Sequence, residues 1–143
     1  MKIAIASDHA GLDFKALLGE HIEAAGHEVA DLGPQSRDSV DYPDFGKKVA
    51  KGVAGGEYDR GVLVCGTGQG MAMTANKIPG VRAAVVQDVF SARMAMLHND
   101  ARVLCLGERV VGPGLAKSLV DAWLESSFEG GRHARRVGKI ENG

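Results

Sequence analysis

Short apolar runs alternate with amphipathic stretches along the 143-residue chain. Apolar runs bounded by glycine and polar residues predict buried strands, whereas apolar positions every three to four residues predict helices. Strands that alternate with helices are typical of an α/β fold with a parallel sheet. The predicted strands are Lys2–Ala6, Glu28–Asp31, Gly61–Val64, Arg82–Val86 and Val103–Leu106. The predicted helices are Gly11–Ala25, Tyr42–Ala54, Gly70–Lys77, Val89–His98 and Pro113–Ser126.

Length and charge narrow the class of protein. The chain fits a single domain, residues 1–143, which is large enough to bury a core without disulfides or a structural metal. We expect a basic C-terminal extension from about residue 128, because arginines concentrate there. A net charge of −1 argues against a dedicated binder of nucleic acid or of an anionic membrane. The two cysteines lack metal-type spacing, which is typical of a reduced cytoplasmic protein.

Cys65 ends a predicted strand and opens the glycine-rich loop Cys65-Gly66-Thr67-Gly68-Gln69-Gly70, which leads into a predicted helix. The carboxyl end of a parallel strand faces the edge at which open α/β sheets bind ligands. Unpaired backbone N–H groups and the positive end of a helix dipole favour both a bound anion and a thiolate. The loop therefore combines a candidate base with an anion-binding cradle.

Other interpretations of this loop stay open. The loop reads G-x-G-x-G, whereas the dinucleotide fingerprint places its third glycine at the position of Met71; Asp88 nevertheless stands where a ribose-binding acid would. A cysteine phosphatase would need an arginine that closes the loop, and none follows before Arg82. A small apolar cysteine packed at a strand end is the structural alternative for Cys65, and Cys105, inside an apolar strand, is expected in the core.

Three polar clusters could converge on the Cys65 loop. Asp8 and His9 follow the first strand; Asp8 either caps the first helix or binds a substrate hydroxyl, and His9 offers a donor to an anion. Tyr42 begins a helix and either packs there or presents its phenol to the site. His98 lies at the end of a predicted helix, before the last strand. Its side chain could contribute to a site or could simply interact favourably with the helix dipole. A metal bound by Asp8, His9 and His98 is possible, but their spacing does not support one.

These motifs together resemble, over essentially the whole chain, the sugar-phosphate isomerase family that contains the type B ribose-5-phosphate isomerases and the galactose-6-phosphate isomerase subunits. The resemblance rests on Ser7 to Gly11, Asp41 to Asp44, Cys65 to Lys77, His98 to Asp100, Gly107 to Gly112 and Phe128 to Arg136. It implies a three-layer α/β/α Rossmann-like sandwich with a five-stranded parallel sheet. It also implies an aldose–ketose isomerase without metal or other cofactor, assembled as a homodimer or homotetramer with active sites shared between subunits.

The resemblance also implies roles for individual residues. Cys65 would carry a proton between C2 and C1 of the sugar, and His98 with Thr67 would open the sugar ring. The enediolate oxygens would be held by the backbone of Gly66, Thr67, Gly68, Gln69 and Gly70. Sugar hydroxyls would be bound by Asp8, Tyr42 and Asn99, and the phosphate by His9, Arg109, Arg132 and Arg136. The Cys65 loop of one chain is expected to meet His98, Asn99 and Arg109 of its partner.

Two positions depart from the family pattern, and several substrates stay open. Ala72 stands where many relatives carry serine, and Met71 where some carry a glutamate base, so Cys65 is the expected base. The first choice of reaction is the interconversion of ribose 5-phosphate and ribulose 5-phosphate. Allose 6-phosphate, galactose 6-phosphate and tetrose phosphates are alternative substrates. A sensor that binds a nucleotide or sugar phosphate without turnover is the alternative from another class.

Overall fold

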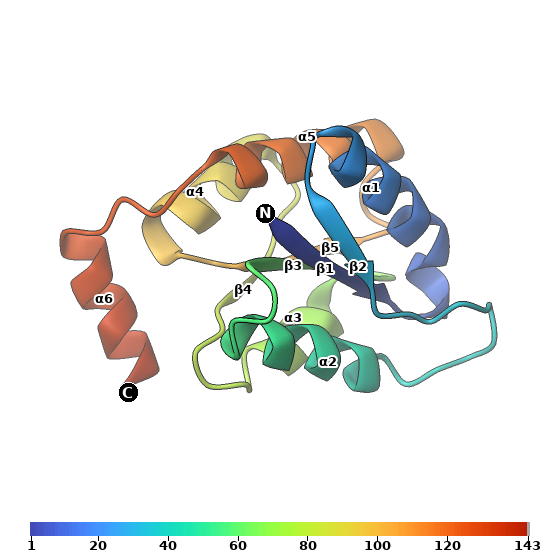
Figure 1. Ribbon diagram of the computed structural model, residues 1–143, viewed down its shortest axis with the longest axis horizontal. Helices are drawn as coiled ribbons and strands as arrows, with labels where there is room; N and C mark the ends of the chain where they lie inside the picture. Colours follow the sequence, from blue (N-terminus) through green and yellow to red (C-terminus); the bar gives the residue numbers. More distant parts are fainter. Residues whose placement is uncertain (143) are drawn as a thin grey trace.

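A five-stranded sheet lies between two layers of helices in the computed structural model, which describes residues 1–142 (Figure 1). All strands run parallel, in the order β2-β1-β3-β5-β4. Their bounds are Lys2–Ser7 for β1, Glu28–Asp31 for β2, Arg60–Cys65 for β3, Ala83–Val85 for β4 and Val103–Gly107 for β5. The predicted α/β/α Rossmann-like sandwich is confirmed, and each predicted strand is present with small shifts at its ends.

The helices cover both faces of this sheet. A single 3₁₀ turn, His9–Gly11, precedes α1. The α-helices are α1 (Leu12–Ala24), α2 (Tyr42–Ala54), α3 (Gln69–Ala75), α4 (Val89–Asn99), α5 (Pro113–Glu125) and α6 (Arg132–Glu141). Helices α1, α4 and α5 cover one face and α2 and α3 the other (Figure 1). Among residues 1–142, no helix has both the length and the apolar character needed to cross a membrane.

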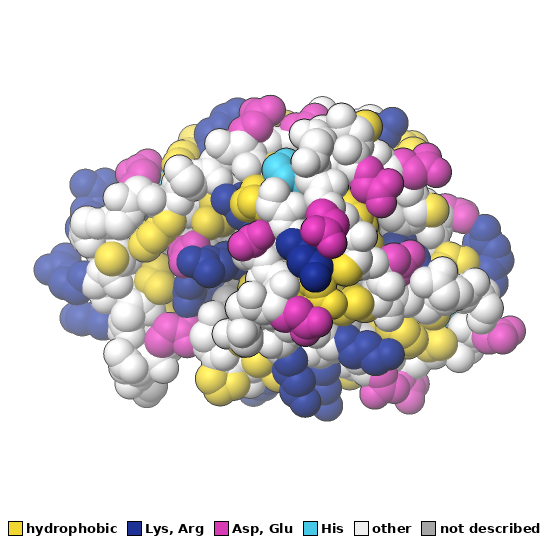
Figure 2. Space-filling model, viewed as in Figure 1, with side chains coloured by type: hydrophobic (Ala, Val, Ile, Leu, Met, Phe, Trp, Pro, Cys, Tyr) yellow, Lys and Arg dark blue, Asp and Glu magenta, His cyan; other side chains and the backbone are white. Residues whose placement is uncertain are grey.

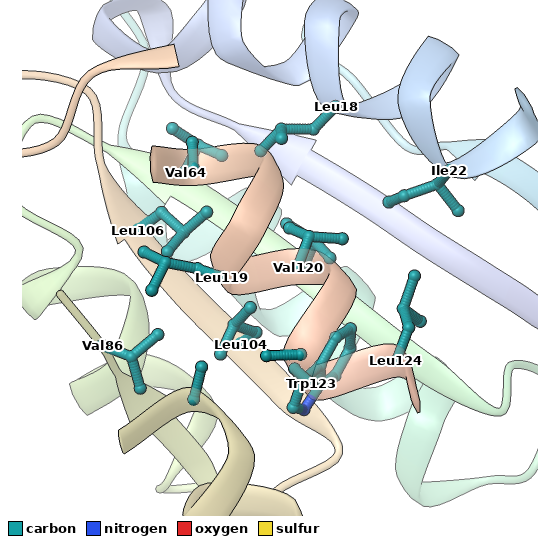
Figure 3. Packing of buried hydrophobic residues seen from close by; sticks show 14 of the residues in the cluster. Leu18, Ile22, Val64, Val86, Leu104, Leu106, Leu119, Val120, Trp123 and Leu124 are labelled. Carbon is teal, nitrogen blue, oxygen red and sulfur yellow. The ribbon is translucent and has the colours of Figure 1, made fainter. Parts of the chain in front are cut away.

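Side chains along the central strands alternate between two cores, as the twofold period of a strand requires. On β3, Val62 and Val64 join the core under α1, α4 and α5, whereas Leu63 and Cys65 belong to the core under α2 and α3. Trp123 of α5 is fully buried in the first of these cores (Figure 3). Cys65 therefore projects toward the α2 and α3 face at the carboxyl end of the middle strand.

The C-terminal segment contains a helix that the sequence analysis did not predict. Helix α6 packs against α4 and buries His133 and Val137, one turn apart, while Arg132 and Arg136 remain exposed. Just before α6, the backbone N–H of Glu129 donates to the carbonyl of Leu97, at 3.0 Å, and so fastens the segment to α4. Only a narrow apolar stripe marks this helix in the sequence, which is why its arginines suggested an extension.

The Cys65 loop depends on a close approach of two backbones. Gly107, at the end of β5, pairs with Cys65 at the end of β3. A Cβ placed on Gly107 would lie 2.7 Å from both Cα and C of Thr67, so a side chain at this position would displace the loop. Gly68 has a φ of 82°, a left-handed conformation that glycine adopts without strain. These two glycines let the loop fold back over the end of the sheet.

We predict that Gly107→Ala lowers the free energy of unfolding by about 1–3 kcal/mol, because the new methyl group overpacks against backbone atoms. Gly114→Ala is the matched control, since a Cβ there would meet nothing within 4 Å. Urea denaturation monitored by circular dichroism measures both changes. Equal stability of the two variants would contradict this account of the loop.

Candidate active site

Backbone hydrogen bonds join the carboxyl ends of β1, β3 and β5 at one edge of the sheet. The N–H of Asp8 donates to the carbonyl of Val64 at 3.1 Å. The N–H of Glu108 donates to the carbonyl of Cys65 at 2.9 Å, and that of Arg109 to the carbonyl of Gly66 at 3.1 Å. The segments after β1 and β5 therefore flank the Cys65 loop.

The thiol of Cys65 lies under its own loop. Its Sγ accepts a hydrogen bond from the backbone N–H of Gly68, at 3.1 Å, and the side chain is 5% exposed. The hydrogen bond holds the sulfur beneath the loop with a backbone donor directed at it. The next N–H, that of Gln69, donates to Oγ1 of Thr67 at 3.3 Å and stabilises the turn. The low exposure of Cys65 is compatible with a structural cysteine packed at a strand end. The backbone N–H donor at its sulfur is equally compatible with a reactive thiol.

Tyr42 and His9 border the loop. Tyr42 opens α2, and its ring packs on Gly70, where a Cβ would lie 2.4 Å from Cε1 of the tyrosine. The Tyr42 side chain is 40% exposed, so it both packs against the loop and presents a surface to a ligand. Nδ1 of the exposed His9 accepts a hydrogen bond from the N–H of Val40 at 3.2 Å, which leaves the proton on Nε2 as a donor.

Asp8 has the capping role that its position suggested. Its Oδ1 accepts hydrogen bonds from the N–H groups of Ala10 and Gly11, at 2.9 and 3.1 Å, where the chain turns into α1. Within residues 1–142, its Oδ2 accepts no hydrogen bond, so one carboxylate oxygen is available to a ligand. Capping and ligand binding are therefore compatible for this residue.

Arg109 corrects one expectation. It was expected to join His98 and Asn99 at the partner's loop, but it lies beside the Cys65 loop of its own chain. A Cβ on Gly66 would be 3.6 Å from Cδ and 3.7 Å from Nε of Arg109. The hydrogen bond from the Arg109 N–H to Gly66 fixes this neighbourhood, because β5 ends beside β3.

A second cluster forms around His98, near the end of α4. The His98 ring stacks on that of His133 from α6, with centroids 4.1 Å apart and 9° between the ring planes. Oε1 of Glu129 lies 3.8 Å from Nε2 of His98, and Oε2 lies 3.7 Å from Nε2 of His133. Burial and the neighbouring charges of His98 and Arg132 lower the pKa of His133. Lys and Arg side chains gather at the α6 end of the molecule (Figure 2), and Arg132, the first residue of α6, is exposed.

The two clusters lie at opposite edges of the sheet. Cys65 is at the carboxyl end of β3, whereas α4 ends just before β5 starts at Val103, which pairs with Gly61 at the other end of β3. The rise from Gly61 to Cys65 is about 13 Å at the usual spacing of a strand. Helix α6 lies beyond the edge from which the strands start (Figure 1). One chain therefore brings His98 neither to Cys65 nor to Asp8 and His9, so a single chain does not assemble the metal site considered for Asp8, His9 and His98.

Two other sequence-based possibilities receive structural explanations. Asp88 caps α4 by accepting a 2.7 Å hydrogen bond from the N–H of Ser91, and this interaction lowers the pKa of Asp88. Its position after a strand is thus explained without a ribose. Cys105 is fully buried, and burial raises its pKa, so the expectation of a core thiol is confirmed.

Sequence reasoning missed three ionisable residues, two in the second cluster and one just after β5. Glu129 and His133 were not singled out; Glu129 lies before α6 and His133 within it, so no helical period linked them in the sequence. Glu108 follows β5; burial, with the charge of Asp13, raises its pKa, and its buried Oε2 accepts no hydrogen bond. Its side chain lies away from both clusters, near the start of α1, since it interacts with the N–H of Phe14.

A cavity of about 600 Å³ adjoins the second cluster and not the Cys65 loop. It lies between the end of α3, β4 and α6, and Lys77, Arg82 and Asn99 are among its lining residues. Arg82 is already bound there, because its Nε donates to the carbonyl of Asn99 at 2.7 Å and its guanidinium pairs with Glu141 of α6. The exposed Asn99 side chain is thus held at the edge that carries His98.

Comparison with known sequences identifies relatives along nearly the whole chain. A family model described as Ribose/Galactose Isomerase matches residues 3–140. Ribose-5-phosphate isomerase B of Escherichia coli strain K12 is 48% identical over 139 residues, 97% of this chain and 93% of that protein. D-erythrulose-4-phosphate isomerase of Pectobacterium atrosepticum is 42% identical over 142 residues, 98% of this chain and 93% of that protein.

Solved structures agree with the sequence matches. Ribose-5-phosphate isomerase B from Clostridium thermocellum is 54% identical, with a TM-score of 0.98 over 99% of this chain and 96% of that one. The enzyme of the same name from Mycoplasma genitalium, solved with bound ribulose-5-phosphate, is 45% identical, with a TM-score of 0.95 over 99% of this chain and 94% of that one. The resemblance inferred from the motifs is confirmed: the protein belongs to the ribose/galactose isomerase family and is an aldose–ketose isomerase.

Proposed function

We propose that the protein interconverts ribose 5-phosphate and ribulose 5-phosphate, with Cys65 as the catalytic base. The observation that carries this proposal is the hydrogen bond from the Gly68 N–H to the Cys65 thiol at the carboxyl edge of the sheet. It gives the thiol a donor that stabilises negative charge at the place where open α/β sheets bind ligands. Relatives named for this reaction support the choice of substrate.

The central step is proton transfer between neighbouring carbons. The Cys65 thiolate takes the proton from C2 of the open-chain aldose and returns it to C1 of the enediolate, while the hydroxyl proton passes from O2 to O1, so that the carbonyl group moves from C1 to C2. The negative charge on the enediolate oxygens is stabilised by backbone N–H groups of the loop from Gly66 to Gly70, a preorganised set of donors. Acid–base chemistry of this kind requires no metal or other cofactor.

Ring opening needs a second acid–base group, and we assign it to His98, with the hydroxyl of Thr67 as its partner. Because His98 and Cys65 lie at opposite edges of one sheet, this assignment requires a second copy of the chain. In such a homodimer, the Cys65 loop of one subunit faces the cluster around His98 of the other. A twofold interface of this type carries two equivalent sites.

The remaining polar residues divide between sugar and phosphate. His9 and Arg109 border the Cys65 loop and supply donors for a phosphate group, and Arg109 offers a forked guanidinium. Exposed Arg132 and Arg136 belong to the His98 cluster, so we assign them to the same phosphate from the partner side. Asp8, Tyr42 and Asn99 bind sugar hydroxyls, and Oδ2 of Asp8 is available for this purpose.

A panel of sugar phosphates tests the substrate assignment. Steady-state rates are measured with ribose 5-phosphate, allose 6-phosphate, galactose 6-phosphate and erythrulose 4-phosphate. Our proposal expects the highest kcat/KM for ribose 5-phosphate. A higher kcat/KM for another sugar phosphate would leave the type of reaction unchanged but would contradict the substrate assignment. Erythrulose 4-phosphate is included because one relative is named for it. Binding without turnover of any sugar phosphate would favour a sensor and overturn the proposal.

The base assignment predicts that Cys65→Ala lowers kcat by about a hundredfold or more, while sugar-phosphate affinity changes only a few fold, because the thiol acts only on the transferred proton. Cys105→Ala is the matched control, since this thiol is buried in the core. Conversion of ribose 5-phosphate, followed by ultraviolet absorbance of the ketose, measures both. Retention of more than about a tenth of wild-type kcat by Cys65→Ala would show that another group is the base.

The shared site predicts complementation between two inactive proteins. Cys65→Ala and His98→Ala homodimers are both expected to be inactive. In a mixed dimer, one site contains both substitutions and the other contains neither, so random exchange of equal amounts restores about a quarter of wild-type activity. Differently tagged subunits allow the mixed dimers to be purified before assay. Purified mixed dimers without activity would show that each site is built from a single chain.

A further inference from the structure

His98, Glu129 and His133 bring three metal-ligating side chains together, a combination that the isomerase mechanism does not use. Two imidazole nitrogens and one carboxylate oxygen of these residues lie within 4.8 Å of one another. The three side chains come from the end of α4, from the segment before α6 and from α6 itself. A cluster drawn from separate parts of the chain is held by the fold and not by local sequence alone.

The distances within this cluster are close to those of a zinc site. Ligands about 2.1 Å from a tetrahedral Zn²⁺ lie about 3.4 Å from one another. The Glu129 oxygens lie 3.8 Å from Nε2 of His98 and 3.7 Å from Nε2 of His133. Because the rings are stacked with only 9° between their planes, both would have to turn about their side-chain bonds to direct the two Nε2 lone pairs at one cation.

The donor set selects a class of cation. Two imidazoles and one carboxylate suit Zn²⁺ and similar transition metals, whereas Mg²⁺ and Ca²⁺ prefer oxygen ligands. Metal binding requires the imidazoles in their neutral form. The His98 and Glu129 side chains are 38% and 50% exposed, so an ion has access and a water molecule could complete a fourth position.

The cluster is also partly preorganised. His133 is buried against α4, and the Glu129 backbone is hydrogen-bonded to Leu97 at 3.0 Å, one residue before His98. Nearby Arg132 and Arg136 oppose a cation, but both side chains are exposed, so solvent screens their charges. The arrangement therefore favours a moderate and reversible affinity.

We propose that His98, Glu129 and His133 form a binding site for a divalent transition-metal ion of the Zn²⁺ class, and that the bound ion inhibits the isomerase. Inhibition rests on the proposed function, because the metal would occupy the Nε2 lone pair of His98 that ring opening needs. Binding itself depends only on the geometry of the cluster. Bound metal is released by a chelator, so inhibition is reversible.

Calorimetric titration of the chelator-treated protein with ZnCl₂ tests the site without any assay of activity. We expect one Zn²⁺ per chain, and an affinity at least tenfold weaker in Glu129→Gln and in His133→Asn. His27→Asn is the control, since His27 accepts a hydrogen bond from the amino group of Met1 and does not belong to the cluster. Unchanged Zn²⁺ affinity in both Glu129→Gln and His133→Asn would overturn the site. Loss of Zn²⁺ binding in Cys65→Ser, with binding retained in the two cluster variants, would also overturn it.

Two further measurements keep the proposal testable if the variants fold poorly or the enzyme proves inactive. Co²⁺ titrated into the wild-type protein should give visible absorption of a histidine- and carboxylate-ligated ion; intense thiolate charge-transfer bands would place the metal on cysteine and overturn the site. With ribose 5-phosphate as substrate, Zn²⁺ should lower kcat and EDTA should restore it. Stoichiometric binding at the cluster without inhibition would overturn the inhibitory role alone, whereas absence of turnover without metal would count against the proposed function and not against the site.

Discussion

The structure depends on the meeting of β1, β3 and β5 at one edge of the sheet. Parallel pairing places Ser7 beside Val64 and Cys65 beside Gly107, so the residues that follow each strand must lie together. Backbone hydrogen bonds from Asp8 and Glu108 then close this edge around the Cys65 loop. Because Gly107 has no side chain, the loop can fold back over β5 and direct the Gly68 N–H at the thiol.

The same parallel arrangement separates the chemical groups of one chain. Each crossover helix returns from the carboxyl edge to the amino edge, so the start of a helix lies near the Cys65 loop and its end lies far from it. Tyr42, at the start of α2, therefore packs on the loop, whereas His98, near the end of α4, does not reach it. The proposed active site needs both Cys65 and His98. It therefore requires a second chain, related to the first by a twofold axis, and not a movement within one chain.

Helix α6 gives the C-terminal segment a chemical role beyond its charge. Burial of His133 and Val137 fixes the helix on α4, which stacks His133 on His98 and brings the Glu129 carboxylate beside Nε2 of both imidazoles. Exposed arginines on the same helix are thereby positioned at the edge that carries His98. Proposed phosphate binding and proposed metal binding both result from the docking of this one helix.

Local patterns in the sequence determined the strands, most helices and the thiol loop, because apolar periodicity and glycine placement act over a few residues. The five strands, the buried Cys105 and the capping of the 3₁₀ turn before α1 by Asp8 follow from such patterns. Only the tertiary structure placed Arg109 beside Gly66 and set His98 at the opposite edge, since strand order and helix direction are properties of the whole sheet. It also revealed α6 and the contact of Glu129 with both histidines, because an arginine-rich helix with two buried residues is defined by packing and not by composition.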